Sequence, residues 1–160
     1  MRLVRRSQKV TLYIGGSGSL LQTYRRMAEE AGLGDSVVFL GFIKDEELPL
    51  WYNRCDVFVL PSISAIQEGW GLVAAEAMAC GKPVIITGVV GMAEEIVRSC
   101  AGLVVPQENS QALAEAVCHM FEHADERRAM GGNALRVVRE KYSWRCYSGA
   151  ILHEYSMAVS

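Results

Sequence analysis

The segment P-S-I-S-A-I-Q-E-G-W-G-L-V-A-A-E-A-M-A-C-G-K-P, residues 61–83, decides the fold of this chain. It places two acidic residues, Glu68 and Glu76, around glycines that open an apolar helix, which we predict over residues 71–80. The first N–H groups of a helix have no partner inside it and lie at the positive end of its dipole. An anion such as a diphosphate can therefore bind against the amides of residues 71–73.

Glu76 stands about 6–8 Å further along this helix than its first free amides, roughly the length of a ribose. A carboxylate at that distance can accept both hydrogen bonds of a sugar cis-diol. Because the helix is apolar on all sides, we expect it to be buried, and a buried carboxylate needs a partner. The sequence has no Lys or Arg between Arg54 and Lys82, so a ligand's hydroxyl pair is the expected partner. The alternative is that Glu68 and Glu76 are ordinary surface carboxylates.

Length and composition limit the possibilities further. The chain has 160 residues, of which 51% are hydrophobic, enough for one domain with a full core but too few for two of ordinary size. The 16 Lys and Arg against 18 Asp and Glu give a formal charge of −2, which argues against nucleic acid as a partner.

The cysteines and the apolar runs indicate a cytoplasmic protein. There are five cysteines, an odd number without any C-x-x-C pair, which argues against a disulfide framework or a zinc site. No apolar run is as long as a membrane span, and residues 1–8 lack the apolar stretch of a signal peptide. Peripheral attachment to the cytoplasmic face of the membrane stays open.

Short β-branched runs alternate with helical stretches, a pattern that predicts an α/β fold with a mainly parallel sheet covered by helices on both faces. The predicted strands are residues 9–14, 36–40, 57–60, 83–87 and 102–105. The predicted helices are residues 20–31, 45–54, 71–80, 93–98, 110–123, 125–141 and 144–158, the last capped by the hydroxyl of Ser143. The last helix has an aromatic stripe, which consists of Trp144, Tyr147, Ile151 and Tyr155. Packing into the core is the default explanation for this stripe. Docking on something outside the chain is the alternative.

Two further loops leave predicted strands at the sheet edge where ligands bind. The glycines of G-G-S-G, residues 15–18, could form a phosphate loop through Gly16 and Gly18, although a plain tight turn is favoured because the third glycine of G-x-G-x-x-G is missing. Residues 40–45 could meet a nucleobase through their backbone, with Phe42 or Ile43 covering one face of the base; a simple strand exit is the alternative.

His119 and His123 lie four residues apart on a predicted helix and could in principle share a metal ion. Acidic residues surround them, so a solvated polar face is the favoured interpretation. We therefore expect no metal site and no bound cofactor.

Seven motifs together resemble the carboxy-terminal domain of glycosyltransferase family four, which comprises retaining enzymes that use nucleotide sugars and have the two-domain GT-B architecture. The motifs are G-G-S-G (15–18), V-F-L-G (38–41), C-D-V-F-V-L-P-S (55–62), E-G-W-G-L (68–72), E-A-M-A-C-G-K-P-V (76–84), G-L-V-V-P (102–106) and Y-S-W (142–144). The resemblance implies a Rossmann-like, mainly parallel sheet sandwiched by helices, forming one half of a GT-B enzyme over residues 1–160.

The resemblance also implies roles for individual residues. Glu68 would be the catalytic carboxylate beside the donor sugar and its leaving phosphate, and Glu76 would bind the ribose hydroxyls. The donor's diphosphate and sugar would bind the segment made of Gly69, Trp70, Gly71, Leu72 and Val73. The base would meet the backbone of Gly41, Phe42 and Ile43.

Three features depart from the family pattern. Its G-R-x-x-x-x-K-G segment, whose Arg and Lys hold the diphosphate, precedes the Gly15 strand in the family and does not occur in this sequence. The amino-terminal acceptor domain and the first strand of this domain are also not in the sequence given. The paired glycines that the family shows near residues 87–91 are reduced to Gly91, with Glu94 and Glu95 following.

The sequence thus predicts the donor-binding domain of a retaining glycosyltransferase of the hexosyltransferase type, which moves a sugar from a nucleotide diphosphate to an unknown acceptor. UDP and GDP are candidate nucleotides, and the nucleotide sugar is a substrate rather than a cofactor. The missing amino-terminal domain is the expected protein partner, and the isolated chain is expected to be inactive. Membrane association would come only through the acceptor or the missing domain. A nucleotide-sugar epimerase of GT-B architecture and a non-catalytic nucleotide-sugar-binding module are the alternatives.

Overall fold

The computed structural model describes residues 10–158 of the chain, so the basic start of the sequence and the first residue of the predicted strand 9–14 lie outside it. The chain divides into two compact units, Met1–Leu48 and Pro49–Ser160. Within residues 10–158, no helix combines the length and the apolar character that crossing a lipid bilayer requires.

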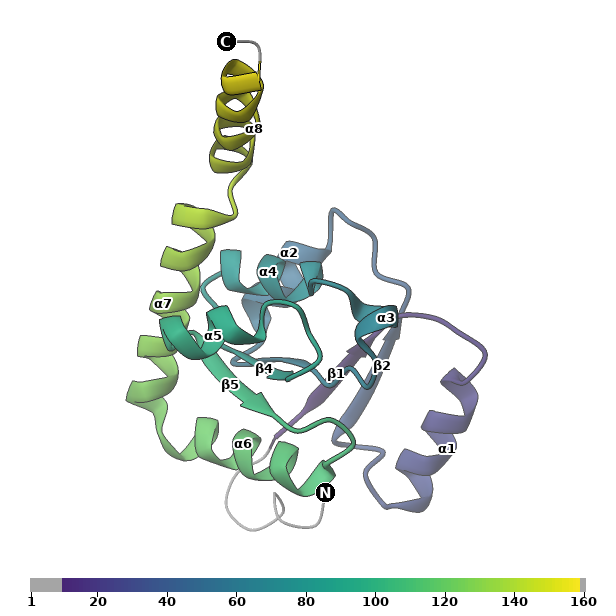
Figure 1. Ribbon diagram of the computed structural model, residues 1–160. Helices are drawn as coiled ribbons and strands as arrows, with labels where there is room; N and C mark the ends of the chain where they lie inside the picture. Colours follow the sequence, from purple (N-terminus) through teal and green to yellow (C-terminus); the bar gives the residue numbers. More distant parts are fainter. Residues whose placement is uncertain (1–9, 159–160) are drawn as a thin grey trace. The chain divides into compact units, whose positions relative to one another are not determined.

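The first unit contains two parallel strands joined through one helix (Figure 1). Its elements are β1 (Leu12–Gly15), α1 (Leu21–Glu30) and β2 (Val37–Gly41). Leu12 pairs with Val37, and the register shifts between Ile14 and Gly15, where β1 gives way to the glycine loop. The parallel pairing agrees with the sequence prediction.

The second unit is built on a three-stranded parallel sheet of order β3-β4-β5. Its strands are β3 (Phe58–Leu60), β4 (Val84–Thr87) and β5 (Gly102–Val105). Its helices are α2 (Leu48–Arg54), which begins at the boundary between the units, α3 (Ala65–Glu68), α4 (Leu72–Ala79), α5 (Ala93–Ser99), α6 (Ser110–Glu122), α7 (Ala124–Lys141) and α8 (Trp144–Ala158). Every residue of the central strand β4 is buried, as expected for a strand covered on both faces.

Successive residues of β4 face two separate hydrophobic clusters, because side chains alternate along a strand. Val84 and Ile86 belong to a cluster that includes residues of α4, α5 and α7. Ile85 belongs to a cluster formed with residues of β5, α6 and the first half of α7. Helices therefore cover both faces of this sheet, which confirms the predicted sandwich.

Two glycines permit close backbone approaches that any side chain would prevent. A Cβ atom on Gly102 would lie 2.0 Å from the carbonyl oxygen of Val84, so β4 and β5 could not pair as they do. A Cβ on Gly131 would lie 2.4 Å from the carbonyl oxygen of Gly81, where α7 crosses the turn after α4. Both glycines therefore fix the distance between neighbouring elements of the second unit.

The predicted elements agree with the structure except at a few boundaries. Helix α2 begins at Leu48 rather than at residue 45, because residues 45–47 form a turn instead. The four-residue helix α3 was not predicted. The predicted cap of α8 is confirmed, since the amide of Cys146 donates to the hydroxyl of Ser143 at 3.3 Å.

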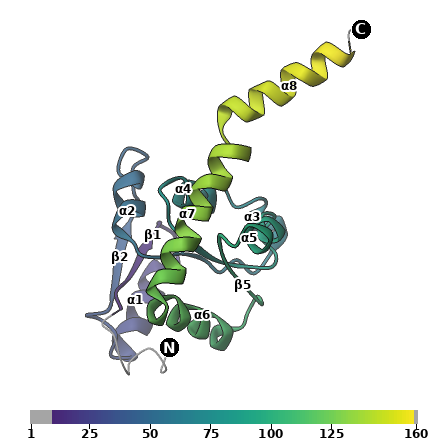
Figure 2. The same cartoon turned by 90° about the vertical axis from the view of Figure 1, so that its left-hand side faces the viewer.

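The default prediction that the aromatic stripe of α8 packs into a core is wrong for the chain described here. Helix α8 has no buried residue, and 84% of the Trp144 side chain is exposed. Figures 1 and 2 show α8 continuing beyond the end of α7, away from the sheet of the second unit. The periodicity correctly identified an apolar face but not what would cover it.

Candidate functional site

Glu76 is held by a tyrosine from another helix. The hydroxyl of Tyr52 in α2 donates a hydrogen bond of 2.8 Å to Oε2 of Glu76 in α4. Tyr52 is buried, and its ring also packs edge-on against Phe58, with ring centroids 5.6 Å apart. Burial raises the pKa of Tyr52, and the hydrogen bond to Glu76 raises it further, so the tyrosine stays a donor.

This contact corrects two expectations about Glu76. Its side chain is half-buried rather than buried, because α4 is not covered on all sides. Four residues of α4 are buried, namely Ala74, Ala75, Ala77 and Met78. The carboxylate also has a partner within the protein, although that partner is a neutral hydroxyl rather than the absent Lys or Arg. The sequence contained Tyr52 in a predicted helix, but nothing in its spacing indicated contact with a residue 24 positions away.

The start of α4 presents its first amides at an exposed surface. The helix is preceded by Gly71 in the left-handed region, with φ of 96° and ψ of 46°. The amides of Ala74 and Ala75 are the ones that donate to the Gly71 carbonyl, at 3.0 and 3.2 Å. The amides of Leu72 and Val73 precede these bonds and have no acceptor within the helix. Leu72 is 65% exposed and Val73 39% exposed, so this end of the helix is accessible.

The glycine segment before α4 is fixed by the loop that follows β4. The amide of Gly91 donates to the carbonyl of Gly69 at 2.9 Å. A Cβ on Gly91 would lie 3.1 Å from the Cα of Trp70, and one on Gly71 would lie 2.5 Å from the Val90 side chain. These close approaches leave no room for a side chain at Gly71 or Gly91 beside the N-terminal end of α4.

The same segment contacts the end of α7. The ring of Trp70 packs against that of Tyr142, the residue that follows α7, with centroids 4.7 Å apart and planes inclined by 70°. Next to it, Glu95 of α5 is only 7% exposed. Nζ of Lys141 lies 2.9 and 3.0 Å from the two carboxylate oxygens of Glu95, and Arg98 also pairs with this carboxylate.

Glu95 therefore links α5 to α7 through its ion pair with Lys141. Burial by itself would raise the pKa of its carboxyl, but the hydrogen bonds and charges of Lys141 and Arg98 outweigh burial and lower the pKa. Nothing in the sequence around Glu95 indicated a contact with Lys141, which lies 46 residues further along the chain.

Glu68, at the end of α3, is positioned by the loop after β3. The hydroxyl of Ser62 donates to Oε2 of Glu68 at 2.6 Å. The carbonyl of Ser62 accepts in turn from the buried hydroxyl of Thr87, at the end of β4, also at 2.6 Å. Glu68 and the α4 segment are separated only by Gly69, Trp70 and Gly71, and the glycines have φ values of 63° and 96° that reverse the chain there.

In the first unit, the two predicted loops lie side by side at the ends of β1 and β2. The amide of Gly16 donates to the carbonyl of Gly41 at 2.7 Å. The side chain of Ile43 occupies the space beside Gly15, where a Cβ would lie 2.6 Å from its Cδ1 atom. Phe42 is 75% exposed. A Cβ on Gly18 would meet nothing within 4 Å, so that end of the glycine loop is open.

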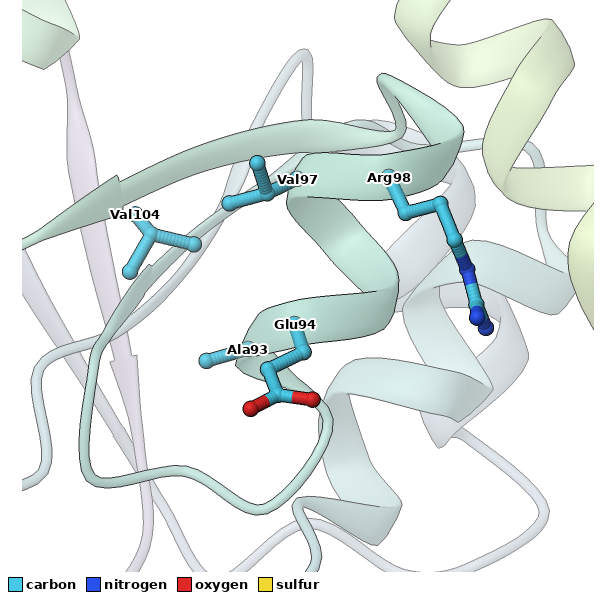
Figure 3. Close-up of a pocket in the computed structure, with 5 residues that line it drawn as sticks. All are labelled: Ala93, Glu94, Val97, Arg98 and Val104. Atoms are coloured by element: carbon cyan, nitrogen blue, oxygen red, sulfur yellow. The ribbon is translucent and has the colours of Figure 1, made fainter.

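Two of the cavities in the second unit are lined by neither Glu68 nor Glu76. The first, of about 380 Å³, lies against α5 and β5, and Figure 3 shows Glu94 and Arg98 of α5 and Val104 of β5 among its lining residues. The second, of about 270 Å³, lies at the carboxyl ends of the strands and includes Pro61 and Thr87, which flank the Ser62 contact with Glu68. The start of α4 is an exposed helix end and belongs to neither of these two cavities.

Comparison with known proteins shows a consistent set of relatives. The family described as "Glycosyl transferases group 1" matches residues 1–137. The chain is 34% identical over 148 residues to an uncharacterised glycosyltransferase of Methanocaldococcus jannaschii, which covers 92% of this chain. It is 33% identical over 144 residues, 88% of this chain, to a GDP-mannose-dependent alpha-(1-6)-phosphatidylinositol monomannoside mannosyltransferase of Mycobacterium tuberculosis.

Solved structures of glycosyltransferases are also similar to this chain. Sucrose-phosphate synthase from Thermosynechococcus elongatus superimposes with a TM-score of 0.79 at 31% identity, covering 95% of this chain and 39% of that one. HepE of Anabaena, in a complex with UDP, has a TM-score of 0.84 at 25% identity, covering 92% of this chain and 41% of that one. These neighbours are GT-B glycosyltransferase structures, which confirms the expected fold class.

The chain spans 37% of the length of each of the two curated relatives described above. It therefore corresponds to one part of those longer proteins, the part that resembles a carboxy-terminal domain. The motif resemblance, the family match over residues 1–137 and the two parallel-sheet units all agree. The chain belongs to the glycosyl transferases group 1 family.

Proposed function

We propose that this chain is the donor-binding part of a retaining glycosyltransferase that moves a hexose from a nucleotide diphosphate to an acceptor. The observation that carries the proposal is the start of α4. The amides of Leu72 and Val73 are accessible there, and the same short helix carries the carboxylate of Glu76, which Tyr52 holds in place. A nucleotide diphosphate presents a matching pair of groups, an anionic diphosphate next to a ribose diol.

The two ends of that pair would bind different atoms of α4. The diphosphate would accept hydrogen bonds from the amides of Leu72 and Val73, with the positive end of the helix dipole favouring its charge. Glu76 can accept about four hydrogen bonds in total, and Tyr52 uses one of them at Oε2. The remaining capacity suits the two hydroxyls of a ribose.

The other site residues would act around this centre. Glu68, fixed by Ser62, would lie beside the donor sugar and its departing phosphate. The amides of Gly69, Trp70 and Gly71 would add contacts to the diphosphate and sugar. The base contact predicted for residues 41–43 and the phosphate contact predicted for Gly16 and Gly18, all in the first unit, stay predictions.

The proposed reaction breaks the bond between the anomeric carbon and the diphosphate oxygen and forms a bond from that carbon to the acceptor hydroxyl oxygen. Departure and attack take place on the same face, so the configuration is retained, and the hydroxyl proton leaves with the diphosphate. The main contribution of the protein would be to stabilise the negative charge that grows on the leaving group, through amides that are already in position. We expect the reaction to take place in the cytoplasm and to need no metal ion.

The relatives suggest which nucleotides to test. HepE has been solved with UDP and with UDP-glucose, and the mycobacterial relative uses GDP-mannose. UDP and GDP are therefore the two leading candidates, and ADP serves as a third arm of the experiment.

Calorimetric titration of the chain with UDP, GDP and ADP tests the binding proposal. We expect one of the three to bind, and Glu76→Ala to weaken that binding about tenfold to one hundredfold, the cost of hydrogen bonds to a charged group. Glu115→Ala, which removes an exposed carboxylate from α6, is the matched control and should bind like the unchanged chain. Equal affinity of the Glu76→Ala and Glu115→Ala variants would contradict the ribose assignment.

A second titration distinguishes the proposed role of Glu68 from that of Glu76. If Glu68 faces the sugar, Glu68→Gln should weaken binding of the nucleotide sugar more than binding of the free nucleotide. The chain by itself should bind donor without transferring sugar, because it corresponds to little more than a third of its relatives. Transfer by this chain alone, measured with labelled donor, would refute that expectation.

A further inference from the structure

Two histidines and a glutamate meet where α6 gives way to α7, and the proposed sugar transfer does not use them. His119 lies in the last turn of α6, His123 is the single residue between the two helices, and Glu126 lies in the first turn of α7. One ligand atom from each residue falls within 4.8 Å of the other two. The sequence favoured a solvated polar face here because it could not show that Glu126 turns toward the histidine pair.

His123 has the ring orientation that metal-binding histidines commonly have. Its Nδ1 atom lies 3.0 Å from the carbonyl oxygen of His119. A carbonyl oxygen only accepts, so Nδ1 carries the hydrogen and Nε2 of the neutral ring keeps a lone pair for a metal. A backbone carbonyl that fixes the second ring nitrogen is a usual outer-sphere partner of a ligating histidine.

His119 and Glu126 supply the other two donors. Nε2 of His119 lies 2.9 Å from Oε2 of Glu126. The two imidazole rings are stacked, with centroids 4.2 Å apart and planes inclined by 24°, so both histidines lie on one side of the helix end. The in-plane lone pairs of two stacked rings run nearly parallel, so one imidazole would turn out of the stack for both rings to bind one zinc ion, whose donors lie about 3.3 Å apart.

The neighbouring arginines are paired with other groups. Arg127 donates to the carbonyl of Met120 at 3.0 Å and lies 3.6 Å from Asp56. Arg128 pairs with Asp125. Within residues 10–158, the Glu126 carboxylate therefore pairs with His119.

We propose that His119, His123 and Glu126 bind one zinc ion, with water in the fourth position. Two imidazoles and one carboxylate form a donor set that zinc prefers and that magnesium and calcium do not. The ion would connect the end of α6 to the start of α7 and fix the angle between these helices. Its role is structural and independent of the sugar transfer.

Calorimetric titration of the metal-free chain with zinc chloride tests this proposal. We expect one zinc ion to bind per chain with micromolar affinity and magnesium chloride to give no binding. His123→Ala and Glu126→Gln should each weaken zinc binding at least tenfold, and the second variant keeps the size of the side chain. His153→Ala, which removes an exposed histidine from α8, is the matched control and should leave the affinity unchanged.

The five free cysteines are an alternative source of zinc ligands, and Cys118 is adjacent to His119 in the sequence. Substitution with cobalt(II) distinguishes the two cases, because a cysteine ligand produces a thiolate-to-cobalt charge-transfer band. We expect no such band, and we expect Cys118→Ser to bind zinc like the unchanged chain. A thiolate band, no zinc binding, or zinc binding that His123→Ala and Glu126→Gln leave unchanged would overturn the proposal.

Discussion

Trp70 and Tyr142 lie edge to face, with ring centroids 4.7 Å apart, although 71 residues of sequence separate them along the chain. Trp70 stands between the two glycines that set up the start of α4, and Tyr142 follows the last residue of α7. The segment proposed to bind the diphosphate thus packs against the residue that follows α7. Packing at that end of α7 should therefore affect nucleotide binding without touching the nucleotide.

Replacing Tyr142 tests this effect. We expect Tyr142→Ala to destabilise the chain by about 1–3 kcal/mol and to weaken nucleotide binding, because Trp70 loses its ring partner and its packing. Tyr142→Phe keeps the ring and should behave like the unchanged chain in both measurements. Urea unfolding and nucleotide titration give the two values, and a Tyr142→Ala variant with unchanged affinity would show that this packing does not affect the site.

Replacing Tyr52 tests how Glu76 is positioned. Tyr52→Phe removes only the hydroxyl that donates to Glu76 and keeps the ring packed against Phe58. We expect a stability loss of about 1 kcal/mol and a several-fold weaker nucleotide affinity, because the carboxylate is no longer held toward one orientation. In the Glu76→Ala background, Tyr52→Phe should produce no further loss of affinity. Additive effects of the two substitutions on the affinity would show that Tyr52 does not act on nucleotide binding through Glu76.

The pKa of Glu95 gives a prediction about acid stability. Its folded-state pKa lies below the ordinary value of 4.5, so its contribution to stability is present above that pH and is lost as the pH falls through the folded pKa. Lys141→Met removes one of the cations that lower this pKa. We expect that variant to lose about 1–3 kcal/mol at pH 7 and to unfold at a higher pH during acid titration than the unchanged chain.

The control for Lys141→Met is Lys44→Met, which removes an exposed lysine from the first unit. It changes net charge by the same amount but does not touch Glu95. Circular dichroism followed during acid titration measures both variants. Equal acid midpoints would mean that net charge, rather than the Glu95 ion pairs, sets the acid stability.

Adjacent glycines in α7 should respond in opposite directions to the same substitution. Gly131→Ala would place a Cβ 2.4 Å from the carbonyl of Gly81 and should destabilise the chain by about 2 kcal/mol or more. Gly132→Ala meets nothing within 4 Å and should stabilise the helix by about 0.4–1 kcal/mol. Urea unfolding of both variants measures the difference, and similar free energies would show that α7 can move away from the turn at Gly81.

The sequence predicted most elements because their signals are local. Apolar runs located the five strands within residues 10–158, and α1 and α4 are each followed by a glycine with positive φ, Gly32 and Gly81. Helix α3 was missed because four residues are too few for a helical period. The early start assigned to α2 arose because residues 45–47 form a turn that propensity alone does not separate from a helix.

The sequence groups the residues of the proposed site but does not indicate their supporting contacts. Glu68, Glu76 and the glycines between them lie in one short segment, so their association could be read directly from the sequence. Their partners come from elsewhere in the fold, as with Tyr52 for Glu76 and Thr87 for the Ser62 carbonyl. Such contacts depend on how helices and strands pack, which periodicity does not reveal.

Helix α8 has 15 residues and no buried side chain, so backbone hydrogen bonds and local contacts alone maintain it. An isolated helix of that length is only marginally stable in water. Its amide hydrogens should therefore exchange with deuterium far sooner than those of the buried strand β4. Slower exchange in α8 after another molecule is added would report directly that its aromatic face has become covered.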